Sequence, residues 1–352
     1  MMKLYIIGAI FLTLITACTH KQSSDATNSN DVNFKEKVSL TADSAAIDVV
    51  IKPGNIYRAD PYIIVSDASE SVDNHFAVFD KDLKYLYSFC RYGQGADECI
   101  MPTVAKNMPA GQFLVRDHAN NRYYRYELSD SGAVMTESFR VPDMNDYESL
   151  WEINHLHDNV YAVKGVAPKK AVRRIMDFAK GYALDSIPPT FDLPSIMGRD
   201  YYTEFDDCWL VSNGGNFACA YYFIDCIEFG RIDNDRMIVE KKVGCDTPPE
   251  FHRFTDEVLT GKYKYNVDYN IVYYEWLFCT DKTVYASYFG EPWGDIKNHS
   301  SRILSYSVDG SAEIEYSINV PLSSFIVLED TGRIIGVNAD RSDDSFYVYD
   351  YN

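Results

Sequence analysis

Helical periodicity is nearly absent from this sequence. Few stretches place apolar residues every three to four positions, as an amphipathic helix would require. Residues 169–180 come closest to that pattern, and they are equally compatible with a strand. Short runs of alternating apolar and polar residues occur instead, and Tyr (28) and Phe (19), which suit half-buried strands, are abundant. The sequence therefore predicts an all-β fold.

Basic residues are also few: 33 Lys and Arg stand against 52 Asp and Glu, giving a formal net charge of −19. Nucleic-acid backbones and anionic lipid surfaces attract positively charged proteins. We therefore expect no nucleic-acid partner. The charge is typical of a well-solvated surface, and it also fits recognition of a cation or a basic partner.

Signatures of common catalytic and cofactor sites are missing. The sequence contains no GxSxG, HExxH, P-loop or GxGxxG motif. His155 and His157 form only an isolated HxH pair, and residues 233–235 lack the glycine and the distal Glu of a calcium loop. We expect no metal and no cofactor. Whether the protein is an enzyme stays open at this point, with a binding role favoured.

Cysteines are present without any CxxC spacing. Of eight in total, seven remain when Cys18 is set aside, so at least one is unpaired even in an oxidising compartment. Cys90 and Cys99 flank a glycine-containing loop and could bridge it. We expect most of the seven to be small buried hydrophobic residues.

The first 17 residues are typical of a lipoprotein signal peptide. Lys3 precedes an apolar run over residues 4–15, which is too short to span a bilayer comfortably. The run leads into Thr16, Ala17 and Cys18, which resembles a bacterial lipobox, so we predict that Cys18 is lipidated. Thr19 is not the Asp that retains enterobacterial lipoproteins in the inner membrane. We therefore expect an outer-membrane anchor, with the domain on either the periplasmic or the cell-surface side.

The remaining chain divides into a tether and one domain. Residues 18–33 contain almost no apolar side chains and are predicted to form a flexible tether. Residues 34–352 repeat an apolar strand that ends in a polar turn, at steps of roughly 45–55 residues, which is the period of a propeller blade. The repeats lie near residues 76–80, 122–128, 174–178, 226–232, 302–308 and 345–350. This layout predicts a six-bladed β-propeller.

The last repeat lacks one strand. After residue 321 there is room for three strands, whereas residues 38–51 form a strand-like segment with no partner of its own. We expect this N-terminal segment to complete the last blade, because closing the ring removes exposed sheet edges.

A glycine-containing loop follows the first repeat. Its glycines permit backbone angles that other residues avoid. The charged residues at its two ends could tie it together by a charge-assisted hydrogen bond. The candidate ligand-binding or loop-anchoring residues are Arg91, Gly93, Gln94, Gly95 and Glu98.

The motifs FDKDL (79–83) and RYGQGADE (91–98) resemble the TolB-like six-bladed β-propeller lipoproteins that are common in Bacteroidetes. The first blade of that family often reads FDKDGKF, followed by RxGxGPGE and an aromatic residue. The present chain keeps the arginine, both glycines and the glutamate. It has Ala96 and Asp97 in place of Pro-Gly, and Cys99 in place of the aromatic residue. The resemblance implies a six-bladed propeller without an assigned activity.

Two kinds of function fit these observations. The first is a non-catalytic binding or scaffolding module for a protein, peptide or glycan, using the end face and channel of a propeller. The second is a hydrolase or lyase of an extracellular polymer, which would need two channel-facing carboxylates about 5–10 Å apart, one with a raised pKa. We favour the first because no such pair of carboxylates stands out in the sequence.

Overall fold

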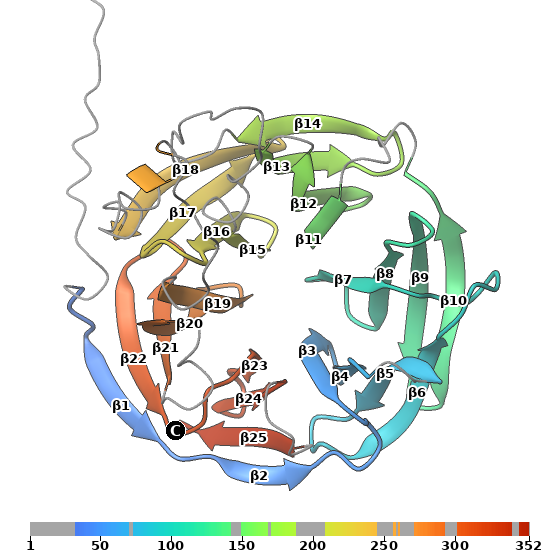
Figure 1. Cartoon of the computed structure of the whole chain (residues 1–352), viewed down its shortest axis with the longest axis horizontal. Coiled ribbons are helices and arrows are strands. Elements are labelled where there is room, and N and C mark those ends of the chain that lie inside the picture. The colour runs from blue at the N-terminus through green and yellow to red at the C-terminus, as the bar shows by residue number, and fades with distance from the viewer. Residues whose placement is uncertain are drawn as a thin grey trace, which may run out of the picture.

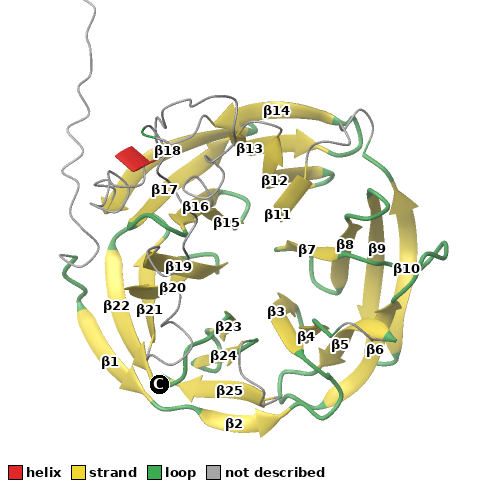
Figure 2. Ribbon diagram, viewed as in Figure 1, coloured by secondary structure: helices red, strands yellow, loops and turns green. Residues whose placement is uncertain are grey.

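In the computed structural model the strands form a ring of sheets around a central axis (Figure 1), so the prediction of an all-β propeller is confirmed. The structure describes residues 32–69, 73–141, 149–167, 170–187, 208–244, 256–257, 260, 271–292, 301–339 and 345–351. Within these ranges the ordered secondary structure is strand, apart from residues 256–257 (Figure 2). No helix among them is long and apolar enough to cross a membrane.

The first strand of each meander lies nearest the axis (Figure 1). These strands are β3 (Pro53–Ala59), β7 (Pro102–Lys106), β11 (Ser149–His157), β15 (Cys208–Ser212), β19 (Ile271–Cys279) and β23 (Ser324–Leu328). The strands that follow them outward are β4 (Tyr62–Asp67), β5 (Asn74–Phe79), β6 (Tyr85–Arg91), β8 (Gln112–Asp117), β9 (Arg122–Ser129), β10 (Gly132–Phe139), β12 (Val160–Ala167), β13 (Lys170–Asp177), β14 (Tyr182–Ile187), β16 (Asn216–Tyr221), β17 (Cys226–Asp233), β18 (Arg236–Gly244), β20 (Thr283–Pro292), β21 (Ser301–Ser307), β22 (Ala312–Ile318), β24 (Arg333–Val337) and β25 (Ser345–Asp350).

Consecutive strands pair antiparallel, as hairpins and meanders do. Two meanders, β7–β10 and β11–β14, join into one eight-stranded sheet. The junction is a short parallel contact between β7 and β11, with Ile153 opposite Ala105 and Asn154 opposite Lys106. The sequence of residues 169–180 is compatible with either a helix or a strand. In the structure this segment lies largely in strand β13.

Two N-terminal strands wrap the outside of the ring. β1 (Glu36–Leu40) runs parallel to β22, and β2 (Asp43–Ala46) runs antiparallel to β25 (Figure 1). The sequence predicted a single strand over residues 38–51, and the structure divides this segment between two sheets. The corner falls at Ala42, whose backbone N–H donates to Asn319 Oδ1 at 3.0 Å. Beyond β2, Ile47 and Val50 leave the sheet and are buried between the first and last meanders.

The core lies between neighbouring sheets rather than around one centre. Phe79 and Phe346, for example, meet edge to face at 5.0 Å between the first and last sheets. Between β17 and β21, Phe229 and Tyr306 pack at 5.2 Å. Burying both faces of each sheet in this way supplies most of the free energy that favours folding.

Aspartates close the outer hairpins. Asp80 Oδ1 accepts the backbone N–H groups of Asp82 and Lys84, both at 2.9 Å, and Asp309 Oδ1 accepts that of Ser311 at 2.9 Å. These are turn-closing bonds that short acidic side chains make readily. They explain why the repeat in the sequence ends each apolar strand with a polar turn.

The described cysteines are largely core residues, as predicted. Five are buried free thiols: Cys90, Cys99, Cys208, Cys219 and Cys279. The structure therefore shows no disulfide across the 91–98 loop, while Cys226 is disulfide-bonded. Of residues 247–266, the structure describes 256–257, which are helical, and 260.

The outer strands give a testable prediction. A chain that starts at residue 47 loses β1 and β2, so it exposes the backbone edges of β22 and β25. We expect its Tm to fall by on the order of 10 °C relative to a chain that starts at residue 32, measured by differential scanning calorimetry. Equal Tm values for the two chains would contradict a stabilising role for the N-terminal strands.

Candidate functional site

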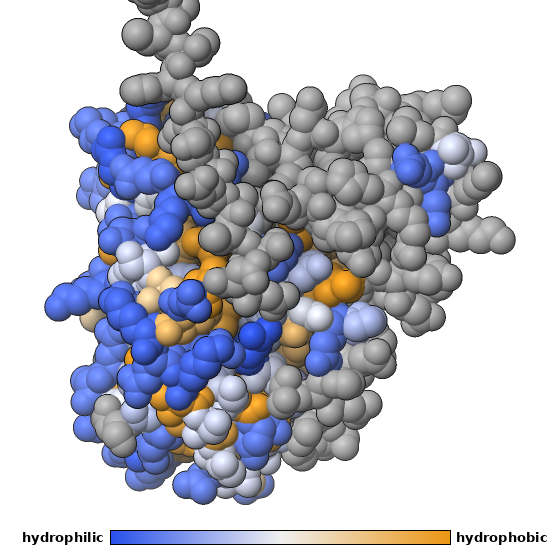
Figure 3. All heavy atoms as spheres, turned by 90° about the vertical axis from the view of Figure 1, so that its left-hand side faces the viewer, coloured by the Kyte–Doolittle hydropathy of each residue, from blue (hydrophilic) through white to orange (hydrophobic). Residues whose placement is uncertain are grey.

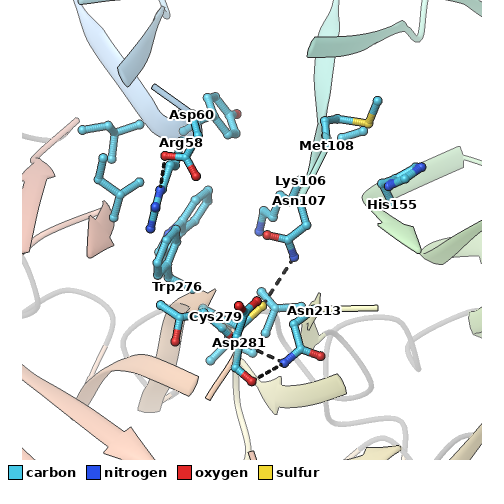
Figure 4. Close-up of a pocket in the computed structure, with 18 of the residues that line it drawn as sticks. Arg58, Asp60, Lys106, Asn107, Met108, His155, Asn213, Trp276, Cys279 and Asp281 are labelled. Carbon is cyan, nitrogen blue, oxygen red and sulfur yellow. Dashed lines mark hydrogen bonds and ion pairs between the residues drawn. The ribbon is translucent and has the colours of Figure 1, made fainter. Parts of the chain in front are cut away.

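The axis of the ring holds a cavity of about 470 Å³. It lies where the innermost strands finish, so its walls are the last residues of these strands and the turns that follow (Figure 4). All the innermost strands run in one direction through the ring, which is why their carboxyl ends converge there. The labelled residues in Figure 4 that line it are Arg58, Asp60, Lys106, Asn107, Met108, His155, Asn213, Trp276, Cys279 and Asp281.

Two asparagines bind the walls together. Asn107 has a left-handed backbone (φ 57°), and its amide donates to the Ser212 carbonyl and, at 3.4 Å, to Cys279 Sγ. Asn213 Nδ2 donates to the carbonyls of Thr280 at 3.2 Å and Asp281 at 2.9 Å. Asn107 therefore links the end of β7 to β15 and β19, and Asn213 links the end of β15 to the turn after β19. These bonds fix the shape of the cavity wall without using a charged group.

Two sets of contacts hold charged side chains at the mouth. Arg58 Nε lies 2.7 Å from Asp60 Oδ1, and Arg58 Nη1 donates to the Val327 carbonyl at 3.3 Å. Glu329 Oε1 accepts hydrogen bonds from Thr280 Oγ1 and Tyr285 OH, both at 3.0 Å. Burial, reinforced by the Glu329 charge, raises the pKa of Tyr285, so this phenol is a donor at neutral pH.

The floor of the cavity is a buried ion pair under an aromatic ring. Lys106 Nζ lies 2.7 Å from Glu152 Oε2, and the two side chains are only 12% and 8% exposed. The same ammonium stands 4.1 Å from the centre of the Trp276 ring, a cation–π distance. Trp276 is itself held by its indole N–H, which donates to the Phe325 carbonyl at 2.9 Å.

More aromatic rings complete the floor. Trp209 packs against Trp276 at 5.6 Å, and Tyr57 approaches Trp276 edge to face at 6.2 Å. Burial raises the pKa of Tyr57, and the Glu152 charge adds to that shift. The pair Lys106–Glu152 is thus surrounded by rings contributed by three other innermost strands, and it ties β7 to β11 where the two meanders join.

Sequence reasoning did not find this site. Lys106, Glu152 and Trp276 are far apart in the chain, and only closure of the ring brings them together. The available signal was weak: a Lys and a Glu each interrupt an apolar segment that becomes an innermost strand. A charge inside such a segment needs a partner, but the partner cannot be read from spacing.

The predicted loop residues lie elsewhere. Arg91 is the last residue of the outer strand β6, and none of Arg91, Gly93, Gln94, Gly95 and Glu98 lines the cavity. Glu98 Oε2 accepts the Gly95 backbone N–H at 2.8 Å, and Glu98 Oε1 lies 4.0 Å from Arg91 Nη2. Arg91 is 71% exposed, so the ion pair is weak. The other predicted site residue, Cys18, lies outside the described residues.

The two histidines of the HxH pair are in different surroundings. His155 lines the cavity, and burial lowers the pKa of its ring. His157 Nε2 lies 2.9 Å from Asp235 Oδ1, and that hydrogen bond raises the pKa of His157. β11 is irregular between the two residues. No group of three potential metal ligands occurs in the part of the chain that the structure describes.

The hydrolase hypothesis required a carboxyl group with a raised pKa in a cleft. Three described carboxyl groups, Asp177, Asp309 and Glu315, have clearly shifted pKa values, and all three are lowered. None of these three lines the cavity.

Gly93 provides a test of the loop. A Cβ built there would lie 2.0 Å from Glu98 Oε2, whereas Gly132, whose φ is 158° against 151° for Gly93, has nothing within 4 Å. We expect Gly93→Ala to lower the free energy of unfolding by about 1–3 kcal/mol more than Gly132→Ala in urea titrations. Adding Glu98→Ala to Gly93→Ala should recover part of the loss. Equal costs for the two glycine variants would contradict the packing of Glu98 over this loop.

The cavity floor provides a second test. Lys106→Met leaves Glu152 buried without its partner, so we expect it to lower the free energy of unfolding by about 3–5 kcal/mol. The double variant Lys106→Met/Glu152→Leu removes both charges and should be more stable than Lys106→Met alone. Chemical denaturation measures both values. A double variant less stable than Lys106→Met would contradict the assignment of a buried ion pair.

Comparison with solved structures places the chain among β-propellers. It matches a member of the DUF4221 family from Bacteroides vulgatus with a TM-score of 0.54 and 10% identity, over 89% of this chain and 97% of that one. It matches a predicted exported protein from Bacteroides fragilis with a TM-score of 0.50 and 12% identity, over 89% and 98% of the two chains. A luciferin-regenerating enzyme also matches, with a TM-score of 0.50 and 11% identity, over 88% and 94%.

No family model and no curated protein matches the sequence. The similarity to solved structures is one of fold, because identities of 10–12% carry no information about a shared site. This chain is therefore a β-propeller that resembles uncharacterised and exported Bacteroides proteins in its fold.

Proposed function

We propose that this protein is a cell-envelope lipoprotein that binds a neutral, polar segment of a glycan or peptide in its axial cavity and releases it unchanged. The observation that supports this proposal most directly is the axial cavity. Its volume of about 470 Å³ lies in the range of small-ligand sites. Its lining combines polar side chains with the ring of Trp276, and the charges of Arg58 and Lys106 are paired with Asp60 and Glu152.

The charge pairing favours a neutral ligand. A charged ligand group would have to compete with Asp60 for Arg58, or with Glu152 for Lys106, and each exchange breaks an existing ion pair. A hydroxyl or a peptide amide of the ligand can bind without breaking either ion pair. The net charge of −19 further disfavours an anionic ligand.

The contacts of Asp60 and Glu329 at the mouth suit ligand binding better than acid catalysis of polymer cleavage. Asp60 is paired with Arg58, and Glu329 accepts two hydrogen bonds. Both side chains therefore already act as acceptors for groups of the protein itself. This argument supports binding over polymer cleavage.

The proposal includes a finer architecture. If the eight-stranded sheet is counted as two blades, the ring has six, and β2 completes the blade that ends in β25. The RYGQGADE motif supports membership of the TolB-like lipoproteins. The lipobox at Cys18 and the fold likeness to an exported protein support an outer-membrane, lipid-anchored location.

A pair of variants on β11 tests the function. His155 lines the cavity, whereas His157, two residues along, does not. We expect His155→Trp to fill the cavity and weaken binding of glycan or peptide fragments at least tenfold, because the bulk occupies ligand space. His157→Trp adds the same bulk outside the cavity and should keep affinity within about threefold of the parent. Glycan and peptide arrays identify ligands, and isothermal titration calorimetry measures their affinity.

The ligand is then recovered after long incubation and weighed by mass spectrometry. An unchanged mass supports a binding module. Shortened fragments, or binding that is equally strong in parent and His155→Trp, would contradict the proposal.

A further inference from the structure

The two asparagines of the cavity wall use their N–H donors within the protein. An asparagine side chain carries two N–H bonds and one acceptor oxygen. The Asn107 amide directs its N–H bonds at the Ser212 carbonyl and Cys279 Sγ. The Asn213 amide donates to two backbone carbonyls and accepts two backbone N–H groups, at 3.2 and 2.8 Å. Asn213 is therefore fully bonded, whereas Asn107 has its acceptor, Oδ1, left for a ligand.

His155 also offers an acceptor. Its Nε2 lies 3.2 Å from the Asp158 carbonyl oxygen, and because a carbonyl only accepts, Nε2 carries the proton of this bond. Burial lowers the pKa of the ring, so His155 is neutral at pH 7 and its other nitrogen, Nδ1, keeps a lone pair. His155 lines the cavity (Figure 4), so this lone pair is a second acceptor of the wall.

Three carboxylates add acceptors at the mouth: Asp60, Asp281 and Glu329. They follow the ends of β3, β19 and β23. Asp60 uses Oδ1 for Arg58, and Glu329 uses Oε1 for two hydroxyl donors, so the second oxygen of each remains open. The Asp281 carboxylate accepts no hydrogen bond from a described residue, although its backbone carbonyl binds Asn213. Since a carboxylate offers about four acceptor positions, all three groups can bind a donor of the ligand.

The side chains that supply further donors at the mouth are cations. Lys282 is exposed beside Asp281, and Arg58 keeps N–H groups beyond those that bind Asp60 and the Val327 carbonyl. Each of these cations weakens the attraction of the neighbouring carboxylate for a positively charged ligand. The lining therefore favours a ligand that brings hydrogen-bond donors without a positive charge.

We infer that the ligand is a neutral glycan whose hydroxyl groups donate to Asn107 Oδ1, His155 Nδ1 and the Asp281 carboxylate. The inference rests on the proposed binding function and names the class of ligand. A hydroxyl rotates to turn its hydrogen toward an acceptor, and its oxygen can still accept from a neighbouring hydroxyl or from water. A sugar ring carries several such groups, and a cavity of about 470 Å³ lies in the range of small-ligand sites.

A peptide segment fits the same lining less well. Each peptide unit brings one N–H donor and one carbonyl acceptor, and neither can change into the other. Beside Asn107 Oδ1 and His155 Nδ1 the peptide carbonyls would face acceptors. A carbonyl that loses water without gaining a donor lowers the affinity, so the wall selects against a chain in which half of the polar groups are carbonyls.

Oligosaccharide and peptide arrays test the ligand class with the unaltered protein. We expect neutral oligosaccharides to bind more tightly than neutral peptides or polyamines. The tightest oligosaccharide is then compared with its monodeoxy analogues by isothermal titration calorimetry. At least one analogue should bind about 10- to 100-fold more weakly, because it lacks a hydroxyl that donates to a charged acceptor.

Asp281→Ala assigns one such hydroxyl. We expect this variant to bind the oligosaccharide about tenfold more weakly than the parent, and no longer to distinguish it from one of the weakened analogues. A purely structural role of Asp281 would instead lower the affinity for all analogues alike. Asp330→Ala is the matched control, because Asp330 is an exposed acid beside Glu329 that does not line the cavity. It should keep the affinities of the parent. His155→Phe should act like Asp281→Ala toward a second hydroxyl, with a loss of about three- to tenfold.

Tighter binding of neutral peptides or polyamines than of any oligosaccharide would overturn the inference. So would a series in which no monodeoxy analogue is weakened more than about threefold, or equal weakening of all analogues by Asp281→Ala. The binding proposal fails separately. Neutral peptides whose binding is lost in His155→Trp would keep the cavity as a binding site and overturn only the glycan assignment. Oligosaccharide binding that His155→Trp leaves unchanged, or no binding of any probe, would contradict both.

Discussion

Burial of sheet faces against neighbouring sheets is the constraint on which the rest of this structure depends. Each meander packs its apolar residues against the meander before it and the one after it, as the Phe79–Phe346 and Phe229–Tyr306 contacts illustrate. When sheets pack in this way around an axis, the first strand of each sheet lies nearest the axis. A space remains between the carboxyl ends of these strands. The cavity is therefore a consequence of ring geometry, and its chemistry is set by whichever residues end the innermost strands.

The buried pair of Lys106 and Glu152 shows how this position constrains side chains. A charge so close to the axis cannot reach bulk water, so it is stable only beside an opposite charge and a polarisable ring. The pair lies at the floor and joins two meanders, whereas the mouth carries the amides of Asn107 and Asn213 beside charged side chains such as Arg58 and Asp60. Binding of a polar, uncharged segment is the function that this arrangement supports best.

The all-β propeller was predictable from the sequence because alternation and turn aspartates recur at regular spacing. Asp80 and Asp309 close hairpins in the structure much as the repeat pattern indicates. The N-terminal segment was harder to place. Its apolar pattern indicates strand, but only Asn319, far along the chain, fixes the corner at Ala42 that splits it between two sheets. Contacts of that kind carry no local signal.

The cavity could not be predicted for the same reason. Glycines and an Arg–Glu pair drew attention to residues 91–98, where the motif is contiguous, whereas the cavity residues come from distant strands that meet only when the ring forms. The most direct test of the account is a crystal structure of the protein with a glycan or peptide fragment that it retains from solution. The account predicts ligand density in the axial cavity between Asn107, Asn213 and His155. Ligand bound at the opposite end of the ring or on the 91–98 loop, with only water in the cavity, would contradict it.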